Sequence, residues 1–526
     1  MNRSRVLWHL TRADFLERVR RYGFLVTLAL AMFLGYGVSV GKIKLWVDNS
    51  RGIYNSAWVG TLMALVCNTF LALAGFYVVK GSVERDRQTG VGQILATTPM
   101  SKALYALGKT ASNLAVLLAM AGVLAVMAVA AQLIAGESAR IDVVELLMPM
   151  AVFCVPVLAI TAALAVLFET LPGLRGGFGN VVWFFSWVTL LSMGAMGSRA
   201  GGTWDLFGLG LISESLFKVT AAKFGANGRN FVLGGITQEG KSRTFLWDGM
   251  DWTPGLLLSR LAWLGVAVGV ALLAARFFDR FDPSRGWQRK SKARKAARNV
   301  AEAAEPIASA PMPTHLQPLP AGARRFRFFG LLRAELRLAL QGQRWWWYAG
   351  AGGLLLAGFA APLDSARAIV LPLSWIWPML LWSSLGNREA RFGTDGLVFA
   401  GPRPLLRQLP ALWLSGVVLA LLTGGAIGLR LALAGDGPGF GAWIVGALFI
   451  PTLALALGVW TGGSKAFEAV YLALWYIGPM QRTVPLDFLG ALPDATRAGV
   501  PLGWLAATAV LGALAVLGRK RQLLAA

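Results

Sequence analysis

The sequence predicts an all-α polytopic membrane protein, with about twelve transmembrane helices arranged as two parallel six-helix pseudo-repeats with amphipathic elbow helices. Composition is the first observation: 56% of the 526 residues are hydrophobic and 14% are charged, whereas a soluble domain carries about 25% charged residues. The second observation is a series of apolar stretches close to the ~20 residues that cross a bilayer as a helix. The third is a charged loop that recurs in register in both halves.

The apolar stretches fall into two groups of six. Most of them have the roughly 17–25 residues that a transmembrane helix needs, and the stretches at 181–196 and 467–477 are the least certain. In the first half the expected spans are 24–40, 58–79, 107–133, 144–168, 181–196 and 256–277, and in the second half they are 346–361, 369–385, 409–431, 440–459, 467–477 and 501–517.

The positive charge of the chain follows the topology of these spans. The formal net charge is +24, and the basic residues gather on alternate loops and at both ends of the chain. The positive-inside rule then places both termini in the cytoplasm. Attraction to anionic lipid headgroups accounts for the basic excess, so we expect membrane lipid as a partner and no nucleic acid.

A composition change divides the chain into two units. Residues 281–325 are rich in Pro, Ala and charge, and such a segment cannot bury a core, which predicts a flexible cytoplasmic linker. We therefore expect a first six-span unit at 1–280 and a second at 326–526. Related motifs and prolines recur in the same order in both units, and both copies of the charged loop are expected on the cytoplasmic side. The predicted repeat is therefore parallel rather than inverted.

A short amphipathic segment precedes the first span of each unit. Arg12 and Asp14 lie in the first segment, and Arg333 and Glu335 occupy the matching places in the second. A helix with apolar residues on one side and arginines on the other can lie in the membrane plane. We predict an interfacial elbow helix at both positions, with flanking anchors for the span as the alternative.

A charged loop follows the second span of each unit. Subtracting aligned positions gives one offset (388 − 85, 389 − 86, 393 − 90 and 402 − 99 all equal 303). The first copy contains Glu84, Arg85, Asp86, Arg87, Thr89, Gly90 and Gly92, and the second contains Arg388, Glu389, Arg391 and Gly393. A charged loop recurring in register between membrane spans indicates a duplicated unit with a cytoplasmic handle on each copy.

Catalysis by this chain is not expected. Gly108–Lys109–Thr110 matches the end of a phosphate-binding loop, but Ala103 stands at the first glycine position and no strand precedes it. The two histidines and the two cysteines show no metal-ligand spacing. We expect no metal site and no cofactor in this chain.

The first charged loop resembles the loop after the second span in ABC-2 type exporter permeases of bacteria. The string Glu84–Arg85–Asp86–Arg87–Gln88–Thr89–Gly90, followed by Thr97–Thr98–Pro99 and Lys102, carries the resemblance, whereas the second copy is degenerate. The resemblance implies a permease of two fused six-span units in the bacterial inner membrane. It also implies one or two cytoplasmic ABC ATPase subunits that dock on these loops, with ATP and Mg²⁺ bound on those partners and none bound here.

Two other classes remain open from the residues alone. One is a major-facilitator-like secondary carrier, because Asp86–Arg87–Gln88–Thr89–Gly90 partly fits its loop signal. The other is a non-transporting, ATPase-driven membrane module that acts on an outside partner through the long loop at 197–254. In that loop we expect Trp247 and Trp252 to anchor at the membrane interface.

Overall fold

The computed structural model describes residues 3–281 and 327–525, apart from 21, 49, 136, 139, 198–204, 226–229, 235–242 and 402. The chain forms two compact units, Met1–Arg289 and Lys290–Ala526, which are described separately. Nearly all of the expected linker lies outside the described residues.

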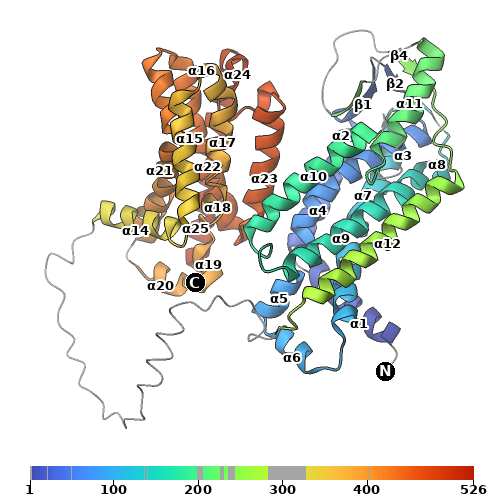
Figure 1. Cartoon of the computed structure of the whole chain (residues 1–526), viewed down its shortest axis with the longest axis horizontal. Coiled ribbons are helices and arrows are strands. Elements are labelled where there is room, and N and C mark those ends of the chain that lie inside the picture. Colours follow the sequence, from blue (N-terminus) through green and yellow to red (C-terminus); the bar gives the residue numbers. More distant parts are fainter. Residues whose placement is uncertain are drawn as a thin grey trace. The chain divides into compact units, whose positions relative to one another are not determined.

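Unit 1 is a helical bundle with a small sheet at one end (Figure 1). Its elements in chain order are α1 (Arg3–Val19), α2 (Tyr22–Ser39), β1 (Lys44–Val47), β2 (Ser50–Gly52), α3 (Ser56–Val66), η1 (Cys67–Leu71), α4 (Ala72–Val79), α5 (Ser82–Gln88), α6 (Val91–Thr97), α7 (Lys102–Ala135), α8 (Val143–Pro149), η2 (Met150–Cys154), α9 (Val155–Thr170), α10 (Gly177–Gly197), α11 (Leu209–Phe224), β3 (Phe231–Gly234), β4 (Arg243–Phe245) and α12 (Pro254–Phe277).

The core of unit 1 is built around α9. This helix packs against α4, α7 and α12, and α7 also contacts α1 and α2. Nearly every residue of α9 is buried, which explains its continuous apolar sequence: a helix that is apolar on all sides is surrounded by other helices or lipid. A π-helical turn links α3 to α4 and another links α8 to α9, so each pair forms one long apolar rod.

The sheet of unit 1 joins two segments that are distant in the sequence. Its strand order is β3-β1-β2-β4, with β1 antiparallel to β2 and β3, and β2 parallel to β4. Beside it, Trp247 is 2% exposed and packs edge-on against Trp58, which also contacts Phe245. The expectation that Trp247 anchors at the membrane interface is therefore wrong, because its ring belongs to this aromatic core.

Unit 2 is a helical bundle without a described strand. Its elements are α14 (Phe328–Leu340), α15 (Trp345–Ala360), α16 (Leu363–Ser365), η4 (Ala366–Val370), α17 (Leu371–Ile376), α18 (Met379–Trp382), α19 (Arg388–Phe392), α20 (Asp395–Phe399), α21 (Pro404–Leu433), α22 (Gly437–Thr461), α23 (Lys465–Trp475), η5 (Tyr476–Met480), η6 (Val484–Leu486), α24 (Pro493–Arg497) and α25 (Val500–Ala525). Here α22 packs against α21 and α25, and α21 also contacts α14 and α15.

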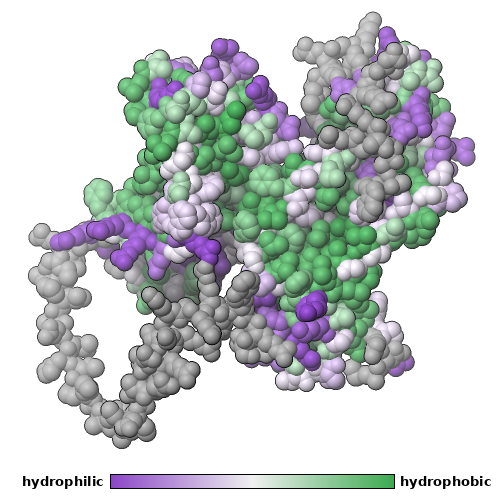
Figure 2. Space-filling view, viewed as in Figure 1, coloured by the Kyte–Doolittle hydropathy of each residue, from purple (hydrophilic) through white to green (hydrophobic). Residues whose placement is uncertain are grey.

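Eight helical segments of the described chain are long and apolar enough to cross a membrane, so this is a multi-pass membrane protein. They are 56–88, 102–135, 143–170, 177–194, 254–277, 404–433, 437–461 and 500–524. The other four expected spans fall on shorter or interrupted apolar helices, namely Thr27–Ser39 of α2, α15, the series η4, α17 and α18, and α23 with η5. Figure 2 shows hydrophobic surface over the middle of each bundle and hydrophilic residues toward its ends, as expected for helices that face lipid.

Candidate functional site

The first charged loop, residues 80–101, forms two short helices at the end of unit 1 opposite the sheet (Figure 1). Gly81 precedes α5 and Gly90 precedes α6, and both have left-handed backbones, with φ of 113° and 76°. Side chains strongly disfavour this region. The glycine at position 90, which the sequence singled out, is thus required by the turn between α5 and α6.

A buried carboxylate from α9 caps the first turn of α5. Glu169 Oε1 accepts hydrogen bonds from the amides of Gly81 (2.6 Å) and Ser82 (3.1 Å), and Oε2 accepts from Val83 (2.7 Å) and Glu84 (2.9 Å). The side chain of Ser82 donates a further bond of 3.3 Å. Four amides that a helix start leaves unpaired are satisfied by this one side chain, and its charge also suits the positive end of the helix.

The charges of α5 are paired with residues of α1 and α7. Arg85 donates to Asp14 of α1, and Lys109 of α7 lies 2.7 Å from Asp14 and 2.9 Å from Asp86. Tyr105 of α7 donates to Asp86 over 2.7 Å. Burial alone raises the pKa of Asp14, but the positive charges of Lys109, Arg18 and Arg85 outweigh burial and hold that pKa below its usual value.

The chain segment after α12 covers the other side of the loop. Asp279 accepts from Arg87 at 2.7 Å and from Arg175 at 3.1 Å, and the Arg87 guanidinium lies 5.8 Å from the centre of the Phe281 ring. Gly92 packs against this ring so closely that an added Cβ would lie 2.6 Å from a ring carbon. The glycine at position 92 is therefore explained by close packing inside unit 1.

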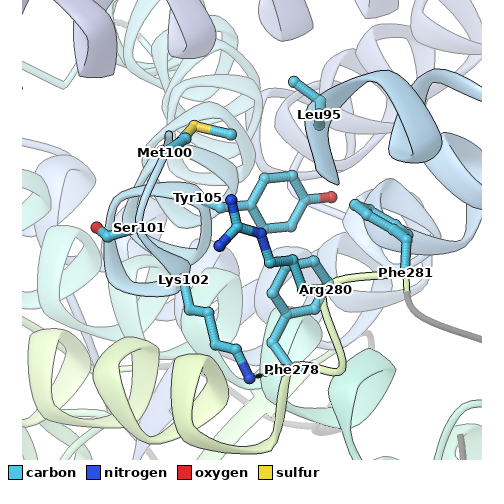
Figure 3. Close-up of a pocket in the computed structure, with 8 residues that line it drawn as sticks. All are labelled: Leu95, Met100, Ser101, Lys102, Tyr105, Phe278, Arg280 and Phe281. Atoms are coloured by element: carbon cyan, nitrogen blue, oxygen red, sulfur yellow. Dashed lines mark hydrogen bonds between the residues drawn. The ribbon is translucent and has the colours of Figure 1, made fainter. Parts of the chain in front are cut away.

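Figure 3 shows how this segment is held against α6 and α7. Tyr105 stacks on Phe278 with ring centres 4.6 Å apart, and Leu95 of α6 packs against the same cluster. Lys102 donates to the carbonyl oxygen of Phe278 over 2.6 Å, and Arg280 donates to that of Thr98 over 2.5 Å. The loop is thus packed and hydrogen-bonded on its inner side from end to end.

The outer side of the first charged loop presents a different set of side chains. Glu84, Gln88 and Thr89 are exposed on α5, and α6 exposes 68% of Ile94 and 43% of Val91. Val91 and Ile94 are three positions apart on one helix face and are rimmed by polar residues, a pattern that occurs at interaction surfaces.

The second charged loop, residues 386–403, has a related geometry in unit 2. Gly393 again has a left-handed backbone, with φ of 61°, between α19 and α20. Arg388 of α19 pairs with Glu335 of α14 at 3.0 Å. Glu389 lies 3.5 Å from Arg519 of α25 and accepts from Gln408 of α21 over 2.6 Å. All residues from 391 to 397 are exposed, and Leu397 has 80% of its surface exposed.

The elbow residues divide in the same way in both units. Asp14 and Glu335 are buried against the charged loops, whereas Arg12 and Arg333 are exposed. Burial raises the pKa of Glu335, and the Arg388 charge offsets this only in part, since the like charge of Glu389 acts in the same direction as burial. The two carboxylates therefore share a position but have pKa values shifted in opposite directions.

Sequence reasoning placed the charged loops but missed what holds them. Among the singled-out residues, Arg85, Asp86, Arg388 and Glu389 are paired inside their own unit, and Arg391 and Thr89 are exposed. The missed residues are Glu169, Asp279, Lys109 and Arg519. An acidic residue at the end of an apolar stretch is the one sequence feature that points to Glu169.

Within the described residues, no group of three or more His, Cys, Asp or Glu side chains is arranged to hold a metal ion. No family model, curated protein or solved structure matches the chain. The geometry of the two loops is therefore what bears on function: short helices with a clamped inner side and an exposed outer side.

Proposed function

We propose that this chain is the membrane-spanning subunit of an ATP-driven ABC-2 type exporter in the bacterial inner membrane. Separate ATPase subunits bind ATP and Mg²⁺ and dock on the two charged loops, and this chain moves the substrate. Both termini and the 281–325 linker face the cytoplasm, as the distribution of basic residues indicates.

The observation that carries the proposal is an exposed aliphatic side chain at the same place on both loops. Ile94 and Leu397 are separated by the offset of the charged motifs (397 − 94 = 303), and they are 68% and 80% exposed. Each follows a left-handed glycine, Gly90 or Gly393, by four residues. An exposed apolar side chain rimmed by polar residues at the same position of both loops favours a contact with a partner protein there.

The order of elements supports two parallel repeats. In both units an elbow helix is followed by a first apolar helix and then by a second that contains a π-helical turn. Two short loop helices and a long third helix come next, followed by three further apolar segments. The last apolar helix packs on the fourth in both units, α12 on α9 and α25 on α22. On this alignment the charged loops of the two units lie on one side of the membrane.

The buried contacts that α5 makes with α9, α1 and α7 connect a docked ATPase to the membrane-spanning helices. Glu169 binds α5 to α9, Asp14 binds it to α1 through Arg85, and Lys109 binds it to α7 through Asp86. When two bound ATPases close, α5 cannot shift alone, because each of these bonds would be broken in a buried site. The spans would then move with the loop as rigid bodies.

This arrangement assigns two roles to the charged residues. Arg85, Asp86, Arg388 and Glu389 hold the loops, since their partners lie inside the unit. The exposed residues contact the ATPase. They are Glu84, Val91 and Ile94 on the first loop, and Arg391, Phe392 and Leu397 on the second. The elbow helices rest at the lipid surface, where Trp8 and Phe329 are exposed.

The test is purification of the tagged chain in mild detergent from its native host, followed by identification of the proteins bound in stoichiometric amounts. We expect one or two ATPases, and we expect Ile94→Asp together with Leu397→Asp to release them, because a charge would be buried at each anchor. Leu524→Asp is the matched control, since Leu524 is 81% exposed at the end of α25 and should leave binding unchanged.

Two outcomes would contradict the exporter. A chain that purifies alone and moves substrate with a proton gradient would be a secondary carrier. A chain that binds ATPases but moves no substrate in vesicles, and instead binds a protein through the 197–254 loop, would be a relay module.

A further inference from the structure

The outer surfaces of the two charged loops differ in chemistry although their positions correspond. At the two positions directly before the left-handed glycine the first loop has Gln88 and Thr89, and the second has Arg391 and Phe392. Phe392 is 67% exposed, and the Arg391 guanidinium lies 5.7 Å from the centre of its ring. Arg and aromatic residues are those that most often dominate binding energy at interfaces.

The extent of the two surfaces differs as well. In the first loop Phe281 covers Gly92, so the exposed run of α6 is interrupted between Val91 and Gln93. At the corresponding place the second loop has Asp395, which is exposed together with the rest of residues 391–397. The second loop therefore offers a continuous exposed run with a cation, an aromatic ring and an aliphatic side chain.

From these differences we infer that the two loops dock on two non-identical ATPase subunits. The inference rests on the proposed function and specifies the partners. The groove for the first loop is shallow and apolar, with a basic residue facing Glu84. The groove for the second loop has a deep apolar pocket for Phe392 and an acidic residue facing Arg391.

One groove does not serve both loops equally well. A pocket deep enough for the Phe392 ring would remain partly empty over Thr89, and an acidic residue placed for Arg391 would face the uncharged Gln88. Empty apolar space and unpaired buried charge both weaken an interface. Two different ATPases remove this mismatch, because specificity is a difference between affinities for two surfaces.

The experiment places a photo-crosslinking amino acid at Ile94 or at Leu397 in the full chain, expressed in its native host. Each adduct is purified under denaturing conditions, and the protein joined to the chain is identified by mass spectrometry. We expect two different proteins, one per position, each with a phosphate-binding loop in its sequence. The double variant Arg391→Gln, Phe392→Thr should then give the Ile94 partner at Leu397 as well.

If the chain that keeps Arg391 and Phe392 crosslinks to the same ATPase from position 94 and from position 397, the inference is overturned and the proposed function remains intact. No ATPase at either position, and none in the purified complex, would instead overturn the proposed function itself. The exchange variant provides a second check, since a partner at Leu397 that does not change would show that Arg391 and Phe392 do not select it.

Discussion

Replacing Glu169 with Gln tests whether the buried carboxylate holds the first charged loop. The carboxylate accepts four backbone amides through two oxygens, two amides on each. A glutamine keeps one oxygen and turns an NH₂ group toward the other pair of donors. At least two buried amides of α5 then lose their acceptor, each at a cost of about 1–3 kcal/mol.

The expected loss is about 3 kcal/mol of local stability at the start of α5. This corresponds to roughly a 100-fold larger equilibrium constant for local opening. Hydrogen exchange followed by mass spectrometry on the peptide that contains residues 81–84 measures this directly, because exchange reports local opening. We expect protection of these amides to fall by about that factor in Glu169→Gln, while amides in the middle of α7 keep their protection.

Glu84→Gln is the matched control. It also replaces a carboxylate near the start of α5 by an amide, but the Glu84 side chain is half exposed and its side-chain partners, Gln88 at 3.3 Å and Arg87 at 4.0 Å, lie in the next turn of the same helix. Its exchange should stay within about twofold of the unmodified chain, as for other exposed side chains. Unchanged protection at residues 81–84 in Glu169→Gln would refute the cap as the support of this loop.

Three further predictions follow from the clamps, each measured by thermal unfolding of the full chain in one detergent. Asp14→Asn should destabilise unit 1 by about 3 kcal/mol because it removes the buried carboxylate that Lys109, Arg85 and Arg18 share, whereas Glu335→Gln should cost less than about 1 kcal/mol, because burial already disfavours its charge. Equal losses would contradict this difference. Arg519→Met should destabilise unit 2 by about 3 kcal/mol, whereas Lys520→Met at the exposed neighbouring position should destabilise it by less than about 0.5 kcal/mol. Similar losses in the two variants would show that the buried pair of Arg519 with Glu389 does not stabilise unit 2. The pKa of Asp14 is lowered by folding, so the stability that its carboxylate contributes is lost only as the pH falls below the ordinary value of 3.8. The pKa of Glu335 is raised by folding above the ordinary value of 4.5, so its protonation stabilises unit 2 as the pH falls toward and below that raised pKa. A pH titration of the Asp14→Asn and Glu335→Gln variants should therefore show opposite differences from the unmodified chain.

The helices themselves could be predicted because hydropathy and length determine them. The expected spans at 107–133 and 256–277 lie inside α7 and α12, and each predicted charged loop forms two short helices. The twelve-span count stays a prediction, since four of the apolar stretches form shorter or interrupted helices. The stretch at 369–385 is broken at Pro378, which ends the hydrogen-bonded ladder between α17 and α18.

The direction in which each charge points could not be predicted. A charged motif looks the same whether its side chains face a partner protein or an ion pair inside the fold. Arg85 pairs with Asp14, which is 71 positions away, and Arg87 pairs with Asp279, which is 192 positions away. Local spacing holds no information about such contacts, so the inner and outer sides of the loop become separable only in three dimensions.

The small sheet was missed for a related reason. Its strands have three or four residues and pair segments as distant as Leu45 and Leu233. Strands this short give almost no alternating pattern, and the nearby tryptophans suggested a membrane interface instead. The burial of Trp247 beside Trp58 shows that aromatic residues in an outside loop can equally form a local core.

The cation that holds the acidic residue of the loop helix comes from a different element in each unit. In unit 1 it is Lys109 of α7, and the position at the same offset in unit 2 is Leu412 (109 + 303 = 412). Arg519 of α25 takes its place beside Glu389, with its guanidinium 5.1 Å from the centre of the Phe399 ring. A buried carboxylate needs a cation, but nothing requires that cation to come from one particular helix. The ion pair of the loop helix therefore reaches the last helix in unit 2 and the third helix in unit 1, although the second loop also contacts its third helix through the hydrogen bond that Gln408 of α21 donates to Glu389.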